Sequence, residues 1–436
     1  MEPVKVGLLG LGTVGGGTVN VLSGNAEEIT RRAGRGIQVY CAATRDSRKA
    51  RSCNTEGIWL TTNPHEVVVD PQIEIVVELI GGTDLARTLV LKAIAQGKHV
   101  VTANKALIAL YGNEIFEAAQ KAGVMVAFEA AVGGGIPIIK ALREGLAGNH
   151  IEWLAGIING TSNFILTEMR DKGCDFAEAL VDAQHRGYAE ANPTFDVEGI
   201  DAAHKLTILA SIAFGIPLQF EQVYTEGIGA ITREDIDYAE QLGYRIKHLG
   251  IARRLVEGVE LRVHPTLIPY RRLIANVEGV MNAILVKGDA VGSTLYYGPG
   301  AGADPTASAV VADLVDVVRA LTSDPENRVP HLAFQPDALV ELPILSMEEV
   351  KTAYYLRMRA LDQPGVLAEV TRVFGEQNIS IEAIIQKEPV AEENHVPIIM
   401  LTQPVLERNM NEAIRRIEDL APIKGPVTRI RLETLG

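Results

Sequence analysis

Short apolar runs and longer segments with helical periodicity alternate over the first 130 residues. The apolar runs are VKVGLL (4–9), IQVYCAA (37–43), IEIVVELI (73–80), HVVTA (99–103) and VMVAFEA (124–130). The segments LARTLVLKAIAQG (85–97) and GNEIFEAAQKAG (112–123) have helical periodicity and end in glycine, as helix C-caps do. Strands that alternate with helices predict a parallel, doubly wound α/β sheet, in which ligands bind at the carboxyl ends of the strands.

From about residue 131 the pattern changes to a mixture of helices and strands. GGGIPIIKALREGL (133–146) predicts a glycine turn and then a helix, and IEWLAGIINGTSNFIL (151–166) predicts a strand, a turn and a helix capped by Thr161 or Ser162. A long helix is expected over LTILASIAFG, strands over VELRVHPTLIP and NAILVKG, and a glycine loop followed by a helix over 292–321. This part of the chain is therefore expected to be α+β.

The last quarter of the chain, from residue 322, follows a third pattern. Residues 322–350 contain four prolines and little periodicity, which is typical of a linker. Residues 353–433 predict strands and helices in the order βαββαβ, which is the ferredoxin-like split unit. Because this unit contains no constellation of nucleophile, base and orienting group, we expect it to bind a ligand and not to catalyse a reaction.

A glycine motif stands between the first predicted strand and the first predicted helix. Gly10-Leu11-Gly12-Thr13-Val14-Gly15 has the G-x-G-x-x-G spacing, in the strand–turn–helix context that a dinucleotide site requires. The first glycine permits a tight turn, the second lets the backbone approach a pyrophosphate, and the third lets helix and strand pack closely. The alternative is a plain glycine-rich turn.

The segment after the second predicted strand selects the cofactor in such sheets. Here Thr44-Arg45-Asp46 supplies both signs of charge, and Arg48, Lys49 and Arg51 make the local balance basic. We therefore expect Arg45 to read a 2′-phosphate, with NADP as cofactor and NAD as the alternative. The other residues just past predicted strand ends are Gly81, Gly82, Asn104 and Lys105.

Composition narrows the class of protein. The chain has 436 residues, a net charge of −14 and no basic stripe, which argues against a nucleic-acid partner. Three cysteines without metal-type spacing fit a reducing, cytoplasmic location. No apolar run reaches membrane length, and the glycine-rich N-terminus lacks the features of a signal peptide, so no membrane association is expected.

The stretch AEANPTFDVEGIDAAHK (189–205) is unusually rich in ionisable groups: Glu190, Asp196, Glu198, Asp201 and Lys205. Asn192-Pro193 interrupts any helix, and the pattern turns helical after Gly199, so Asp201 and Lys205 share one helix face. Two interpretations are open at this point, a surface ion pair or a polar active-site pocket.

The run from Ala183 to Lys205, with Gly187-Tyr188-Ala189, Asn192-Pro193, Asp196-Val197, Gly199 and Asp201, resembles the signature of homoserine dehydrogenases. Thr102-Ala103-Asn104-Lys105 and Gly300-Ala301-Gly302 also fit that family. Residues Asp362-x-Pro364-Gly365-Val366-Leu367 and Asn378-Ile379-x-Ile381 resemble an ACT domain, a module that usually binds small amino acids. The resemblance implies a Rossmann-type domain over 1–130, completed by 300–321, a catalytic and dimerisation domain over 131–321, a linker over 322–350 and an ACT domain over 351–436.

The chemistry implied by the resemblance is NAD(P)H-linked reduction of L-aspartate 4-semialdehyde to L-homoserine, in threonine and methionine biosynthesis. Lys205 would donate the proton, with Lys105 beside it. Glu190 and Asp201, with Asp196, would bind the substrate's ammonium group. Lys105, Gly187 and Gly302 would join the glycine motif at the cofactor.

The resemblance further implies a monovalent cation, Na⁺, held by the Glu129 side chain and the carbonyls of Val132, Gly134 and Ile136. It implies threonine as feedback inhibitor at the ACT domain, on Asp362, Gly365, Val366, Leu367 and Asn378. Because such modules usually pair, a homodimer or homotetramer is expected.

Two other classes of function stay open on the sequence. A sensor protein without turnover would need a pocket that lacks a proton donor, which Lys205 and Lys105 argue against. A dehydrogenase acting on another small oxo acid would have no need of both Glu190 and Asp201.

Overall fold

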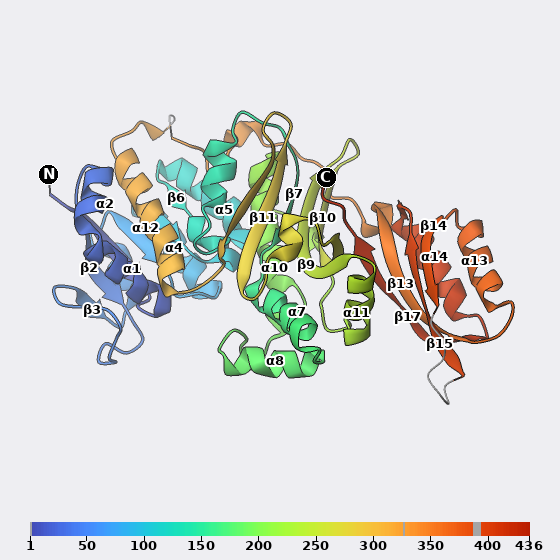
Figure 1. Ribbon diagram of the computed structural model, residues 1–436. Helices are drawn as coiled ribbons and strands as arrows, with labels where there is room; N and C mark the ends of the chain where they lie inside the picture. Colours follow the sequence, from blue (N-terminus) through green and yellow to red (C-terminus); the bar gives the residue numbers. More distant parts are fainter. Residues whose placement is uncertain (1, 326–327, 387–393) are drawn as a thin grey trace. The chain divides into compact units, whose positions relative to one another are not determined.

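The computed structural model describes residues 2–325, 328–386 and 394–436 of the chain (Figure 1). The chain divides into two compact units. The first comprises Met1–Gly160, Asp201–Val223 and Val280–Leu342, and the second Thr161–Ile200, Tyr224–Gly279 and Pro343–Gly436. Residues 326–327 of the predicted linker and 387–393 of the predicted C-terminal module lie outside the described residues.

The first unit contains a six-stranded parallel sheet in the order β3-β2-β1-β4-β5-β6, the order of doubly wound dinucleotide-binding folds. The strands are β1 (Val4–Leu9), β2 (Ile37–Ala43), β3 (Trp59–Thr61), β4 (Ile75–Glu78), β5 (His99–Thr102) and β6 (Val126–Ala127). The predicted mixed α/β, Rossmann-type class is confirmed. The apolar run 124–130 is longer than its strand, because the chain turns into the 3₁₀ helix η1 (Glu129–Ala131).

Helices cover this sheet: α1 (Thr13–Gly24), α2 (Ala26–Ala33), α3 (Pro64–Val69), α4 (Asp84–Ala95), α5 (Lys105–Ala122) and α12 (Ala303–Ala320). Helix α12 lies against α1 although nearly 300 residues separate them, and a Cβ on Gly17 would come within 2.8 Å of the Ala303 carbonyl oxygen (Figure 1). Val310 and Leu314 of α12 share a buried core with Val6 and Leu8 of β1.

The rest of the first unit combines helix α10 (Ile200–Phe214) with an antiparallel ladder, β12-β11-β7. Its strands are β7 (Ile151–Ile157), β11 (Met281–Gly288) and β12 (Gly292–Pro299), so a strand occupies the first part of the predicted glycine loop. The stretch after the 133–135 glycines is helical, as α6 (Ile138–Lys140) and the π-helical η2 (Ala141–Gly145). Part of the predicted linker packs here, since Val340 N–H donates to the Gly215 carbonyl at 2.9 Å.

The second unit contains the helices α7 (Gly160–Lys172), α8 (Phe176–His185), α9 (Thr194–Val197) and α11 (Arg233–Gln241), with β8 (Tyr224–Thr225), β9 (Tyr244–Arg254) and β10 (Val259–Pro269). The prediction that Thr161 or Ser162 caps α7 is wrong, because both lie inside that helix. Their hydroxyls instead donate to more distant carbonyls, Thr161 to Tyr188 after α8 at 2.7 Å and Ser162 to Asp196 of α9 at 3.1 Å.

The C-terminal part of this unit has the predicted ferredoxin-like order. Its elements are β13 (Lys351–Leu361), α13 (Val366–Glu376), β14 (Ile381–Gln386), β15 (His395–Thr402), β16 (Val405–Leu406), α14 (Glu407–Glu418) and β17 (Ile423–Leu432). The strand order is β17-β13-β15-β14, and the two helices lie over one face around a buried core (Figure 1). Strand β17 also pairs in parallel with β10, through Thr266–Arg431 and Leu267–Leu432.

Within residues 2–325, 328–386 and 394–436, none of the helices is both long and apolar enough to cross a membrane.

Candidate active site and cofactor loop

The glycine loop after β1 is shaped by close backbone contacts. Gly10 has a φ of +106°, and a Cβ there would lie 2.8 Å from the Leu79 carbonyl oxygen, so only glycine fits without strain. A Cβ on Gly15 would collide with the Gly10 carbonyl. A Cβ on Gly12, the N-cap of α1, would have no neighbouring atom of the described residues within 4 Å. Thr13 and Val14 open the helix, so the loop presents backbone N–H groups of a helix N-terminus to open space, as a pyrophosphate requires.

The segment after β2 places several basic side chains in solvent, among them Arg45, Arg48 and Lys49. Arg45 is exposed, and no hydrogen bond or ion pair is recorded for it within the described residues. Arg51 instead folds over the loop, donating to the Thr44 hydroxyl at 2.9 Å and the Lys49 carbonyl at 2.7 Å. Asp46 accepts from the Arg48 N–H at 2.9 Å. The loop is therefore held by Arg51 and Asp46, while the exposed side chains of Arg45 and Arg48 face solvent, and Arg45 is the one that directly follows the strand end.

Two lysines and one aspartate meet in the first unit. Lys205 Nζ donates to Asp201 Oδ2 at 2.7 Å and to the Ile158 carbonyl at 2.7 Å. Lys105 forms an ion pair with the other oxygen of Asp201, and Asn159 Nδ2 donates to Oδ2 at 2.8 Å. The side chains are 2% exposed for Asp201, 10% for Lys205 and 34% for Lys105. The structure thus brings together the three residues that the sequence placed at the carboxyl end of β5 and on one face of α10.

The local sequence explains why these charges meet. Lys105 is the first residue of α5, whose N-cap Asn104 accepts the Leu107 N–H at 3.1 Å. Asp201 and Lys205 stand one turn apart at the start of α10. Burial alone would raise the pKa of Asp201, but the ammonium groups of Lys205 and Lys105 outweigh it and hold that pKa below its usual range. Asp201 is therefore a carboxylate at neutral pH.

Sequence reasoning missed the residue that shapes the end of β4. Glu78 is fully buried, accepts the Ile80 N–H at 2.9 Å and accepts the Thr102 hydroxyl at 2.8 Å. Burial raises the pKa of Glu78 against these hydrogen bonds. The Thr102 hydroxyl also receives the Asn104 N–H at 3.0 Å, so Glu78 fixes the turn that leads into Lys105. A glutamate near the carboxyl end of an apolar run is the signal that could have identified it.

Three other predicted site residues belong to the second unit. Glu190 is exposed, and its backbone carbonyl accepts from Gln184 Nε2 at 3.1 Å. Asp196 is half-buried at the start of the short helix α9. Gly187 has a φ of +74° at the turn that follows α8, so a glycine is favoured there by the backbone itself.

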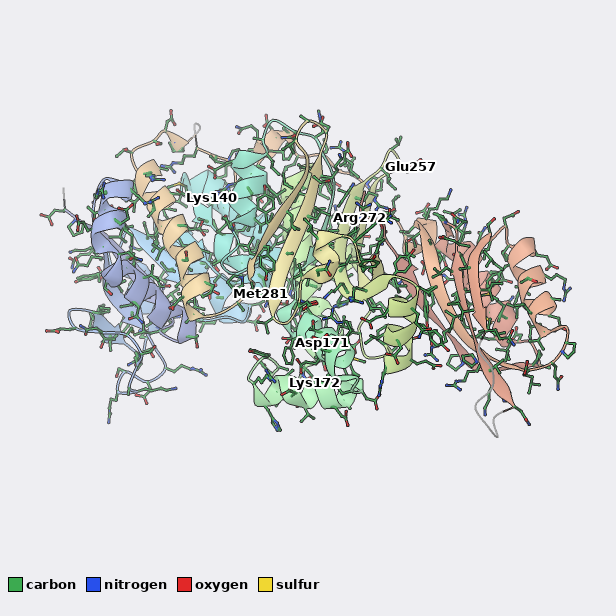
Figure 2. All side chains as sticks on the ribbon, viewed as in Figure 1. Lys140, Asp171, Lys172, Glu257, Arg272 and Met281 are labelled. Carbon is green, nitrogen blue, oxygen red and sulfur yellow. The ribbon has the colours of Figure 1, made fainter. Side chains whose placement is uncertain are left out.

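The predicted cation residues lie around another buried acid, Glu129. The Glu129 carboxylate accepts the N–H groups of Ile139 at 2.9 Å and Lys140 at 2.8 Å. Its own N–H donates to Asp313 of α12 at 2.8 Å, and burial, with Glu129 nearby, raises the pKa of Asp313 to about 8. Lys140, labelled in Figure 2, forms an ion pair with Asp316, which lies in α12 like Asp313.

The glycine loop beside Glu129 packs against a second glycine loop. Gly135 N–H donates to the Pro299 carbonyl at 3.2 Å, and a Cβ on Gly134 would lie 2.9 Å from the Ala301 nitrogen. The Ile136 carbonyl already accepts the Ile138 N–H at 2.8 Å. Gly302, with a φ of +129°, precedes α12. The predicted ligand carbonyls of Val132, Gly134 and Ile136 therefore lie where two backbone loops meet.

Family models match the chain in three segments. The model described as "Homoserine dehydrogenase, NAD binding domain" matches residues 10–129, "Homoserine dehydrogenase" matches 137–315, and "ACT domain" matches 354–420. A homoserine dehydrogenase of Pseudomonas aeruginosa is 66% identical over the whole of both chains.

The chain belongs to the homoserine dehydrogenase family.

Other members of the homoserine dehydrogenase family agree with this. The homoserine dehydrogenase of Neisseria gonorrhoeae is 55% identical over the full length of both chains. The crystal structure of a homoserine dehydrogenase from Thiobacillus denitrificans matches with a TM-score of 0.96 and 69% identity, covering 100% of this chain and 99% of that chain. The resemblance is confirmed, and the chain is an NAD(P)-dependent oxidoreductase of amino-acid biosynthesis, in the threonine and methionine pathway.

The ACT domain of this family member holds the predicted effector residues around α13. Gly365, with a φ of +95°, is the N-cap of that helix, and Val366 is buried in the core while Leu367 packs against it. Asp362 is exposed and accepts from Gln386 Nε2 at 3.4 Å.

Asn378 has a structural reason of its own. Its φ is +57°, its N–H donates to Gly375 at 3.1 Å, and the Ile379 N–H donates to Phe374 at 2.9 Å. These two bonds form a Schellman motif, in which Asn is the commonest substitute for glycine. The asparagine in this part of the ACT signature is thus explained by the end of α13 as well as by any ligand.

Proposed function

We propose that the chain reduces L-aspartate 4-semialdehyde to L-homoserine with a hydride from NAD(P)H, and that Lys205 protonates the oxygen. The single observation that carries the assignment of roles is the cluster of Lys105, Asp201 and Lys205 at the carboxyl end of β5. Two ammonium groups and one carboxylate carry a net positive charge. Such a charge stabilises the oxygen that becomes negative when hydride reaches the aldehyde carbon.

Each member of the cluster has a separate task in this mechanism. Lys205, nearly buried, delivers the proton to the alkoxide oxygen. The hydride on the carbon and the proton on the oxygen together convert the aldehyde to the alcohol. Asp201, held ionised, orients both ammonium groups and stays charged through the reaction. Lys105, the most exposed of the three, orients the substrate and shares the developing charge.

The substrate's ammonium group is assigned to Glu190 and Asp201, with Asp196 in support. Carboxylates are the acceptors that an ammonium group needs, and Glu190 is exposed and so available to a ligand. The assay is NADPH oxidation by the full chain with L-aspartate 4-semialdehyde, and with succinic semialdehyde, which lacks only the amino group. We expect turnover to prefer the amino substrate strongly. Equal kcat/KM values for the two aldehydes would remove the assignment of Glu190 and Asp201 to the ammonium group.

The cofactor is assigned as NADP, with NAD as the alternative. The support is the exposed guanidinium of Arg45 just past β2, where the ribose of the adenosine half lies in this type of sheet. Bound NAD(P)H supplies the hydride. Gly10, Gly12, Thr13, Val14 and Gly15 would hold its pyrophosphate, and Lys105, Gly187 and Gly302 are assigned to the same cofactor.

A monovalent cation, Na⁺, is assigned to Glu129 and the carbonyls of Val132, Gly134 and Ile136. One carboxylate and several backbone oxygens suit a hard cation. Among the described residues no group of three or more His, Cys, Asp or Glu side chains is arranged to hold a metal, so this site would depend on the carbonyls. The fit has one cost, because both oxygens of Glu129 already accept backbone N–H groups.

The ACT domain is assigned to feedback inhibition by threonine, on Asp362, Gly365, Val366, Leu367 and Asn378. The start of α13 presents backbone N–H groups suited to a carboxylate. Such modules pair, so the enzyme is proposed to be a homodimer or homotetramer. Threonine should inhibit the full chain and inhibit Asp362→Asn less. An enzyme indifferent to millimolar threonine would remove the assignment.

The proposed organisation follows from these assignments. Residues 1–130 with 300–321 bind the cofactor, 131–321 form the catalytic and dimerisation domain, 322–350 connect, and 351–436 regulate. A cytoplasmic location fits a biosynthetic enzyme whose three cysteines are all free.

A further inference from the structure

A cavity of about 560 Å³ lies in the second unit, lined by the segment 226–232 and by residues of α14 and β17 of the ACT domain. Its polar lining includes Glu226 from that segment and Arg429 from β17, together with Arg415 and Glu418 of α14. Ile231, Ile414 and Val427 form an apolar part of the wall. The start of α13, where the effector is assigned, is not among the residues that line it.

Buried ion pairs connect the two charged sides of this cavity. Arg431, fully buried, donates to Glu226 Oε2 at 2.7 Å and also pairs with Glu407. Glu407 Oε1 lies 2.9 Å from Arg429 Nη1. Glu226 and Arg429 therefore stand at opposite ends of one chain of alternating charges, which holds both side chains in place.

Each end of that chain keeps hydrogen-bonding capacity. Within the described residues, the recorded partners of the Glu226 carboxylate, Arg431 and the Tyr224 hydroxyl, are both on Oε2, which leaves Oε1. The recorded bonds of Arg429, to Glu407 and Asn411, are both made by Nη1, which leaves Nε and Nη2. The cavity thus offers an acceptor with negative charge and a donor pair with positive charge beside an apolar wall.

We propose that this cavity binds a free α-amino acid with an apolar side chain. Its ammonium group would pair with Glu226, its carboxylate with Arg429, and its side chain would pack on Ile231, Ile414 and Val427. A guanidinium and a carboxylate that are already positioned lose little freedom when they bind such a zwitterion. The site is separate from that assigned to threonine and does not depend on the catalytic proposal.

The ligand would also join two parts of the second unit. Glu226 belongs to the segment after β8, whereas Arg429 belongs to β17 of the ACT domain. Occupancy would therefore stabilise the contact between these parts, and binding can be followed without any turnover assay.

The test is calorimetric titration of the full chain with L-methionine as probe, with N-acetyl-L-methionine and L-methioninol as analogues that lack one charge each. We expect L-methionine to bind at millimolar or lower concentration and both analogues to bind about tenfold or more weakly. Glu226→Gln and Arg429→Met should weaken L-methionine by a similar factor, while Asp362→Asn should bind it normally.

Three results would overturn the proposal. They are the absence of L-methionine binding to the wild-type chain, equal binding of the three probes, and binding that Asp362→Asn abolishes but Glu226→Gln and Arg429→Met leave unchanged. The analogue comparison uses only the wild-type protein, so it decides the question even if a variant misfolds. Thermal unfolding of each variant without ligand shows whether its fold is retained.

Discussion

Glu433→Gln should destabilise the second unit strongly. Glu433 Oε1 accepts from Arg262 Nη2 at 2.5 Å, and Oε2 accepts from Arg253 Nη2 at 3.0 Å. Arg262 is 1% exposed and has Glu260 as its other acidic partner, with Nε to Oε2 at 3.1 Å. The charges of the two arginines, Arg253 and Arg262, balance those of the two glutamates, Glu260 and Glu433. Glutamine keeps the size of the side chain but leaves one buried positive charge without compensation.

The magnitude follows from that burial. Breaking a buried pair by removing one partner costs about 3 to 5 kcal/mol, and the amide oxygen of glutamine restores part of it, so we expect about 3 kcal/mol. For a unit of this size that corresponds to a fall of about 6 to 12 °C in Tm. Thermal and urea unfolding followed by circular dichroism would measure it.

The matched control is Glu257→Gln, at an exposed glutamate between β9 and β10 (Figure 2). It should change stability by no more than about 0.5 kcal/mol. Adding Arg262→Met to Glu433→Gln should recover part of the loss, because the uncompensated charge is then gone. If Glu433→Gln unfolds with the midpoint of Glu257→Gln, the reasoning about the buried network is refuted.

The same network bears on removal of the ACT domain. Residues 350–436 supply Glu433 to Arg262 and a strand partner to β10. They also supply Arg357, which donates to Asp235 of α11 at 2.6 Å. Deleting them would remove these partners together with the effector residues, so effector binding is better tested by point variants.

Three further outcomes are expected. Lys205→Met should lower kcat by about 10² or more while cofactor still binds, whereas the exposed control Lys172→Met should leave kcat unchanged. A near-normal kcat of Lys205→Met would contradict the role of Lys205. Arg45→Ala should raise the KM for NADPH and leave that for NADH unchanged, whereas equal effects would show that Arg45 does not read the phosphate. Burial lowers the pKa of His331, and of His99, to about 4, against about 6.5 when unfolded. Their contribution to stability is therefore present above pH 6.5 and lost as the pH falls toward 4, and His331→Gln should flatten that part of the unfolding profile.

Much of the sheet around the cofactor loop could be predicted, because its determinants are local. The strands 4–9 and 37–43 are apolar runs bounded by turn residues, and the structure has them at the same residues. Helix α5 begins at Lys105, seven residues before the predicted segment, because Asn104 caps it. The asparagine is present in the sequence, but its place directly after an apolar run does not by itself distinguish a helix cap from a strand end.

Features that depend on distant partners could not be predicted. The pairing of β17 with β10 joins residues more than 160 positions apart, and periodicity carries no information about such a pair. The cap expected at Thr161 or Ser162 fails for a similar reason. Their hydroxyls are hydrogen-bonded to the carbonyls of Tyr188, after α8, and of Asp196, in α9, which only the tertiary structure brings near.

The Lys105–Asp201–Lys205 cluster shows how burial separates the two interpretations of the polar stretch 189–205. If Asp201 and Lys205 formed a surface ion pair, the Asp201 side chain would be exposed to solvent. Such a pair would stabilise the fold by at most about 1 kcal/mol. Asp201 is instead 2% exposed, inside a helix whose residues 201–214 are all buried. A buried ion pair is often no more stable than apolar residues of similar size, so stability gives α10 no reason to carry these charges. Glu190, in the same stretch, is exposed and contributes no such cost. The buried charges of Asp201 and Lys205 are therefore explained by a role in catalysis and not by a contribution to the stability of the fold.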